Sequence, residues 1–135
     1  MSRRPSHPLV VSGIIERGGR EVLIGRVDGA AGEDHTWEFP TGQVNAGESP
    51  EAAMRRVAVE TVGVTIDILI GQPPFAGRHR GADVDYRYFL AGAVSGDARG
   101  IAYPEVRWVL RGALREYVFD PAIQEVVEWY LTADK

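Results

Sequence analysis

The segment from Ser49 to Gly63 carries the signals of a helix with both ends defined. Ser49 can accept a hydrogen bond as the N-cap, Pro50 suits the first helical position, and Gly63 suits the C-terminal cap. Glu51 places a negative charge near the positive end of the helix dipole. We therefore expect a helix over Pro50–Val62, against which the rest of the chain must pack.

The rest of the chain consists mainly of β-rich runs separated by turns. The expected extended segments are Leu9–Glu16, Glu21–Val27, Thr36–Gly42, Val64–Gly71, Val84–Val94 and Glu105–Leu110. The expected loops are Asp28–Asp34, Gln72–Asp83 and Ser95–Pro104. The turn sequence RGGR makes a hairpin of the first two strands, and Pro121 opens a final helix, PAIQEVVEWYL. Strands mixed with two helices predict a sheet covered by helices, an α/β sandwich.

Length and composition are typical of one globular domain. The chain has 135 residues, 44% of them hydrophobic and 25% charged. We expect a flexible N-terminal arm over residues 1–8 and a single domain over residues 9–135. The absence of cysteine excludes disulfides, zinc-thiolate sites and cysteine nucleophiles.

Net charge and hydropathy argue against two classes of partner, nucleic-acid polymers and membranes. The net charge of −4 gives no general attraction to nucleic-acid polymers or anionic membranes. The apolar run LVVSGII is too short, and too interrupted by Ser and Gly, for a signal-peptide core or a membrane span. We expect a cytoplasmic protein without membrane contact or a specific nucleic-acid partner, and the sequence leaves a homodimer open.

The most specific motif is GQVNAGESPEAAMRRVAVETVGV, from Gly42 to Val64. Five residues separate Gly42 from Glu48, seven more lead to Arg56, and Glu60 and Gly63 follow. This spacing resembles the Nudix box, which reads Gly, five residues, Glu, seven residues, Arg-Glu-apolar, any residue, Glu-Glu, any residue, Gly-apolar. The preceding WEFPTG resembles the Trp-Glu-Phe-Pro-Gly-Gly of many Nudix hydrolases.

The resemblance spans about Leu9 to Leu131 and implies a fold and an activity. The implied fold is an α/β/α sandwich with a mixed sheet, the box helix on one face and a C-terminal helix. The implied activity is Mg²⁺- or Mn²⁺-dependent attack of water on the pyrophosphate of a nucleoside diphosphate linked to another group. The sequence does not choose between nucleoside triphosphates, dinucleoside polyphosphates and nucleotide sugars.

Three positions depart from the family pattern. Val57 and Thr61 stand where the family has glutamate, and Thr41 replaces the first glycine of the Gly-Gly pair. Positions 57, 60 and 61 project within an arc of about 100° on a helix, so three glutamates there would form a metal-binding cluster. This helix keeps only Glu60. Val57 and Thr61 instead continue an apolar stripe and are expected to face the core.

The resemblance also implies roles for individual residues. Glu60, the carbonyl of Thr41 and Glu48 would hold metal; the catalytic set would be Glu60, Arg56 to orient carboxylates, and Glu105. Glu105 or Glu48 would substitute for the missing glutamates. Each has a plain structural alternative: an Arg56–Glu60 ion pair, an acid near a helix N-terminus for Glu48, and a solvated charge at a strand end for Glu105.

Substrate contacts are expected from Arg78, Arg80 and Glu38, the two arginines gripping phosphate with His79 between them. The alternative for the loop residues is a solvated charge run. The first hypothesis is therefore a Nudix-type hydrolase. The alternative is a nucleotide-binding or regulatory module with little or no hydrolysis, and a structural or protein-interaction role comes third.

Overall fold

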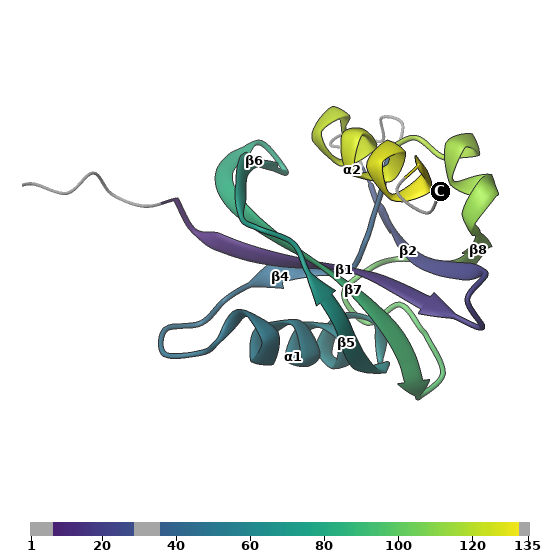
Figure 1. Cartoon of the computed structure of the whole chain (residues 1–135), viewed down its shortest axis with the longest axis horizontal. Helices are drawn as coiled ribbons and strands as arrows, with labels where there is room; N and C mark the ends of the chain where they lie inside the picture. Colours follow the sequence, from purple (N-terminus) through teal and green to yellow (C-terminus); the bar gives the residue numbers. More distant parts are fainter. Residues whose placement is uncertain (1–6, 29–35, 133–135) are drawn as a thin grey trace, which may run out of the picture.

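The computed structural model describes residues 7–28 and 36–132 of the chain. The expected arm lies outside the described residues over positions 1–6, as does most of the expected loop Asp28–Asp34. The described residues form one eight-stranded mixed sheet and two α-helices. The expected α/β architecture with a mixed sheet is confirmed (Figure 1).

The strands follow the sheet order β3-β2-β1-β7-β5, with β4 on β1, β6 on β7 and β8 on β2. β1 and β7 run parallel, and every other pair is antiparallel. The strands are β1 (Leu9–Arg17), β2 (Glu21–Val27), β3 (Thr36–Glu38), β4 (Thr41–Gln43), β5 (Thr65–Gly71), β6 (Phe75–His79), β7 (Ala82–Ser95) and β8 (Val106–Leu110).

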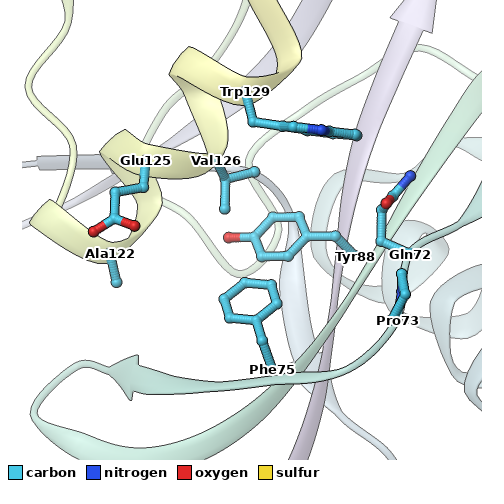
Figure 2. A pocket seen from close by; sticks show the side chains of 8 residues that line it. All are labelled: Gln72, Pro73, Phe75, Tyr88, Ala122, Glu125, Val126 and Trp129. Atoms are coloured by element: carbon cyan, nitrogen blue, oxygen red, sulfur yellow. The ribbon is translucent and has the colours of Figure 1, made fainter. Parts of the chain in front are cut away.

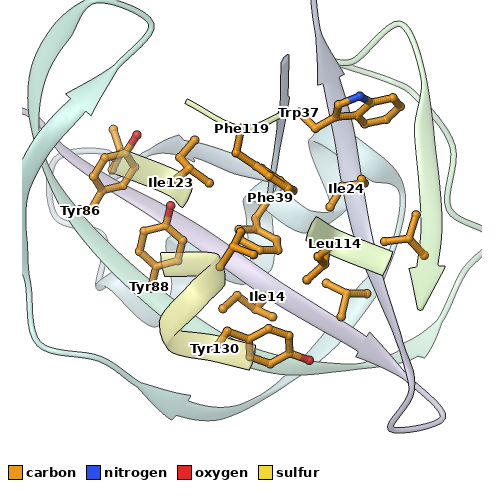
Figure 3. Close-up of a cluster of buried hydrophobic side chains, with 14 of the residues drawn as sticks. Ile14, Ile24, Trp37, Phe39, Tyr86, Tyr88, Leu114, Phe119, Ile123 and Tyr130 are labelled. Atoms are coloured by element: carbon orange, nitrogen blue, oxygen red, sulfur yellow. The ribbon is translucent and has the colours of Figure 1, made fainter. Parts of the chain in front are cut away.

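Two helices cover opposite faces of this sheet, α1 (Pro50–Val62) and α2 (Pro121–Thr132) (Figure 1). A short 3₁₀ helix, Arg111–Glu116, follows β8. Alternate residues of β1 serve the two faces, since Val10 belongs to the α2-side core and Val11 to the α1-side core. The α2-side core is rich in aromatic rings (Figure 3). No helix in residues 7–28 and 36–132 is long and apolar enough to cross a membrane.

The ends of α1 form as the sequence predicts. Ser49 Oγ accepts a hydrogen bond from Ala52 N at 3.1 Å, and Pro50 occupies the first turn. Gly63 is left-handed, with φ of 74°, and the Gly63 and Val64 amides donate to Val59 and Ala58 carbonyls at 3.1 and 3.2 Å. This is the hydrogen-bond pattern that a glycine cap allows at a helix C-terminus.

The expected loop Gln72–Asp83 is wrong, because β6 and the start of β7 form a hairpin there. Arg80 and Gly81 make its two-residue turn with φ of 53° and 85°. Positive φ at both turn positions matches the twist of a hairpin and suits the glycine. Of the residues that suggested a loop, Pro73 and Pro74 precede β6, Gly77 lies within it and Gly81 lies in the turn that follows. The expected extended piece Thr36–Gly42 is likewise divided, since its two halves pair with β2 and β1.

The N-cap of α1 gives a test of this local account. Ser49→Ala removes the acceptor for the Ala52 amide and should lower the free energy of unfolding by about 1 kcal/mol. Ser95→Ala, at the exposed end of β7, should change it by less than about 0.5 kcal/mol. Chemical denaturation of both variants measures the difference, and equal stability of the two would contradict the cap.

Candidate active site

Arg56 ties the turn before α1 to the helix and to β4. Its Nε and one terminal nitrogen donate to the two oxygens of Glu48 at 2.8 and 2.9 Å. Its other terminal nitrogen donates to Glu60 at 2.9 Å, and a further bond of 2.7 Å reaches the Gln43 carbonyl. Bidentate arginine–carboxylate pairs are among the stronger and more directional contacts in proteins. Arg56 thus stabilises the turn between β4 and α1 through its bonds to Glu48 and Gln43.

The charges of this cluster are fixed by the same contacts. Hydrogen bonds from Arg56 and from the Asn45 amide lower the pKa of Glu48 to about 2. The hydrogen bond to Glu48 raises the pKa of Arg56 above its ordinary value. Glu48 is therefore an anion whose oxygens already accept from Arg56 and Asn45. Glu60 differs, because its side chain is 60% exposed and contacts Arg56 from the surface.

Val57 fills the space beside β4. Its side chain is 1% exposed within the α1-side core. A Cβ added to Gly42 would lie 2.7 Å from one Val57 methyl group, so the helix approaches the strand as closely as glycine permits. The expectation that Val57 faces the core is confirmed. At the first position where the family has glutamate, this chain therefore has a valine that packs against β4.

Thr61 stands at the other position where the family has glutamate. Unlike Val57, it is only partly buried. Its hydroxyl donates to the Val57 carbonyl at 2.6 Å. Its own carbonyl accepts from the Ile101 and Ala102 amides, both at 3.1 Å. The end of α1 is therefore joined to the loop between β7 and β8, and Thr61 turns its hydroxyl toward its own helix.

These residues do not fit a resident divalent metal ion. Mg²⁺ binds through oxygen ligands, usually one or two carboxylates together with phosphates and water. Both oxygens of Glu48 are taken up by Arg56, and the exposed carboxylate of Glu60 also accepts one hydrogen bond from Arg56. Within residues 7–28 and 36–132, no three His, Cys, Asp or Glu side chains gather closely enough to hold a metal. Glu105 accordingly does not join Glu48 and Glu60.

Glu105 lies instead among arginines at the start of β8. Its two oxygens accept from Arg26 at 2.9 Å and from Arg107 at 2.6 Å. The hydrogen bond from Arg107 lowers the pKa of Glu105 below its usual range, and the charge of Arg26 adds to this effect. An ionised carboxylate between two guanidinium groups is a structural anion. Its expected role as a substitute ligand or base stays a prediction.

Thr41 lies on β4 with its side chain inward. Its hydroxyl bonds to Ser12 Oγ at 2.8 Å and to the Phe39 carbonyl at 2.6 Å. Its amide donates to the Tyr103 hydroxyl at 3.1 Å rather than to β1. In an antiparallel pair, the amide and carbonyl of one residue face the same side. The Thr41 carbonyl therefore also faces away from β1, an orientation compatible with its expected ligand role.

Glu38 is a buried carboxylate, with its side chain 4% exposed. It accepts from Tyr103 at 2.6 Å, from Arg80 at 3.2 Å, and pairs with His79 Nε2 at 3.1 Å. Burial, followed by the Glu38 charge, raises the pKa of Tyr103, so this phenol remains a donor. A buried carboxylate needs such partners, because without them its desolvation is costly.

A cavity of about 230 Å³ opens beside Glu38. The three residues expected to contact substrate, Glu38, Arg78 and Arg80, all line it. Tyr86 and Ile123 also line the cavity and belong to the aromatic core (Figure 3). Arg78 and Arg80 keep side-chain exposures of 67% and 52%. The cavity thus combines a buried acid with two exposed cations.

Sequence reasoning missed the hydroxyl of Tyr103, which joins Glu38 to the amide of Thr41. The ring of Tyr103 also packs closely, since a Cβ on Gly25 would lie 2.6 Å from it. Sixty-five residues separate Tyr103 from Glu38. Patterns among neighbouring residues do not predict a contact between positions so far apart in the sequence.

Comparison with known proteins agrees with this architecture. The family model described as NUDIX domain matches residues 6–130. The RNA pyrophosphohydrolase of Proteus mirabilis is 55% identical over 31 residues, which are 23% of this chain and 18% of that protein's length. The chain therefore matches less than a fifth of the length of this curated relative.

Solved structures match over nearly the whole chain. A MutT structure from work on Aliivibrio salmonicida and Vibrio cholerae is 29% identical, with a TM-score of 0.73 and coverage of 95% of this chain and 98% of that one. The MutT protein of Methanosarcina mazei is 20% identical, with a TM-score of 0.76 and coverage of 98% of both chains. The match to the family model over residues 6–130 is decisive, and this chain belongs to the Nudix family.

Proposed function

We propose that this protein binds a nucleoside diphosphate linked to a second group, and that it retains the ligand rather than hydrolysing it rapidly. The observation that carries the proposal is Val57, buried against Gly42 where the family motif has a glutamate. Rapid metal-dependent hydrolysis needs a cluster of carboxylates, and of positions 57, 60 and 61 only position 60 carries one.

The cavity beside Glu38 supports ligand binding. Arg80 donates one hydrogen bond to Glu38, and a guanidinium group has five N–H donors. The others can therefore meet phosphate oxygens in the bidentate geometry that arginine favours. Glu38 and Asp120 line the same cavity and can accept from N–H groups of a base. The site thus offers separate groups for the two ends of a nucleotide.

A second candidate, slow hydrolysis, is favoured by Glu60. Its exposed carboxylate lies on the box helix at a position that the family motif assigns to metal. A divalent ion brought by the substrate's phosphates would then meet one protein carboxylate. This candidate keeps the expected dependence on Mg²⁺ or Mn²⁺ and differs from the first in turnover, which an assay can measure.

The experiment that separates the candidates combines binding and turnover on one panel. Titration calorimetry with ADP, a nucleotide sugar and a dinucleoside polyphosphate measures binding, and a phosphate-release assay with Mg²⁺ or Mn²⁺ measures hydrolysis. Saturable binding with turnover at the uncatalysed background supports the binding function. Metal-dependent turnover that is lost in Glu60→Gln supports slow hydrolysis instead.

Arg80 provides a direct test of the cavity. Arg80→Ala should weaken ADP binding at least tenfold, which is about 1.4 kcal/mol, because it removes charge-assisted bonds to phosphate. Arg17→Ala is the matched control, since Arg17 is 49% exposed and lies over Trp108, outside the cavity. Equal affinities of the Arg80→Ala variant and the unaltered protein would remove the nucleotide from this cavity.

Restoring the family's glutamates tests whether the helix face still suits a metal. The double change Val57→Glu, Thr61→Glu should lower the free energy of unfolding by on the order of 3 kcal/mol, since position 57 is buried without a partner for charge. Val59→Glu, on the half-exposed outer face of α1, should cost little. Melting curves with and without Mg²⁺ check both variants. Recovery of stability by Mg²⁺, with new turnover, would favour a hydrolase that lost its ligands.

A further inference from the structure

A second cavity, of about 260 Å³, lies between α2 and the strands β6 and β7. Phe75 and Tyr88 project into it from the strands, and Trp129 and Val126 from the helix, while Glu125 lies at one end (Figure 2). None of these residues lines the cavity beside Glu38. We call this second space the aromatic pocket.

The walls of the aromatic pocket are ring faces that remain partly open to solvent. Phe75 is 38% exposed and Trp129 is 43% exposed, whereas Tyr88 is buried. Phe75 and Tyr88 stack with centroids 5.7 Å apart and an interplanar angle of 9°. Figure 2 shows these two rings nearly face-on and Trp129 edge-on, so the faces border different sides of the space. Aromatic residues that gather exposed around one cavity are unfavourable in water, and such patches commonly mark binding sites.

The charge of the aromatic pocket is one-sided. Glu125 is the single charged residue among those that line it, and no lysine, arginine or histidine does so. The faces of aromatic rings are also negative, because of their quadrupole. A phosphate group would therefore be repelled, while a cation would be attracted by the rings and by the carboxylate together.

We infer that the aromatic pocket binds a compact organic cation, an alkylated ammonium group. Such a group presents methyl surface to Trp129, Phe75 and Tyr88, and its charge is neutralised by Glu125. Ring faces on different sides suit a rounded cation better than a flat base, which needs two parallel faces.

The pocket adjoins the proposed nucleotide cavity. Tyr86 lines that cavity, and its ring stacks on Phe75 with centroids 5.6 Å apart. Helix α2 also borders both spaces, through Ile123 and Val126. The inference therefore deepens the proposed function and rests on it: the group linked to the nucleoside diphosphate carries the ammonium.

The test compares choline with its neutral analogue, in which a carbon atom replaces the nitrogen. Indole N–H signals in ¹⁵N spectra report binding, because the chain has three tryptophans and Trp129 alone lines this pocket. Choline should shift the Trp129 signal in a saturable way and bind at least tenfold more tightly than the neutral analogue. Equal binding of the two compounds, or no shift with choline, overturns the inference.

Two variants locate the effect. Trp129→Ala, followed by titration calorimetry, and Glu125→Gln, followed by the Trp129 signal, should each weaken choline binding at least fivefold. Glu128→Gln makes the same change of charge on the same helix, at a residue that does not line the pocket, and should change the affinity less than twofold. An equal loss in Glu125→Gln and Glu128→Gln would reduce the effect to general electrostatics and overturn the assignment.

Titration with ADP separates this inference from the function on which it rests. ADP binding without choline binding leaves the proposed function standing and removes the cation site. Choline binding without ADP binding leaves a cation site but refutes its link to a nucleoside diphosphate.

Discussion

The contact on which the site depends is the packing of α1 against β4. Val57 lies against the backbone of Gly42, and Arg56 joins Glu48, Glu60 and the Gln43 carbonyl in one charged cluster. A buried methyl group and a set of directional hydrogen bonds thus fix the same junction from two sides. The carboxylates of Glu48 and Glu60 at this junction therefore already bind Arg56 before any ligand approaches.

This arrangement separates two properties that the family motif usually combines. The glycine, the arginine and Glu48 preserve the geometry of the turn and helix, while two positions of the carboxylate cluster have become Val57 and Thr61. The cavity proposed to bind the ligand depends on different residues, chiefly Glu38 and Arg80. The residues proposed to bind the ligand therefore differ from the positions where glutamates have been replaced, and the Tyr103 hydroxyl connects Glu38 to β4.

The sequence predicted most of what is set by neighbours along the chain. The caps of α1 follow from single residues at fixed offsets, and the burial of Val57 follows from its place in an apolar stripe. β6 escaped prediction because its turn carries Arg80 at positive φ, where sequence rules expect glycine or asparagine. The bond from Tyr103 to Glu38 escaped because only the folded sheet brings them together. Arg78, Arg80 and Glu38, which the sequence suggested as substrate contacts, line one cavity, although Arg78 and Arg80 were expected in a loop.

Titration of Mn²⁺ into the ligand-free protein, followed by electron paramagnetic resonance, tests the central claim most directly. Glu60, which also pairs with Arg56, should give no saturable site below about millimolar Mn²⁺, since such an ion needs more oxygen ligands than one carboxylate can give. Glu60→Gln should leave that baseline unchanged. A stoichiometric micromolar site in the free protein, lost in Glu60→Gln, would contradict the account and place a working metal centre on α1.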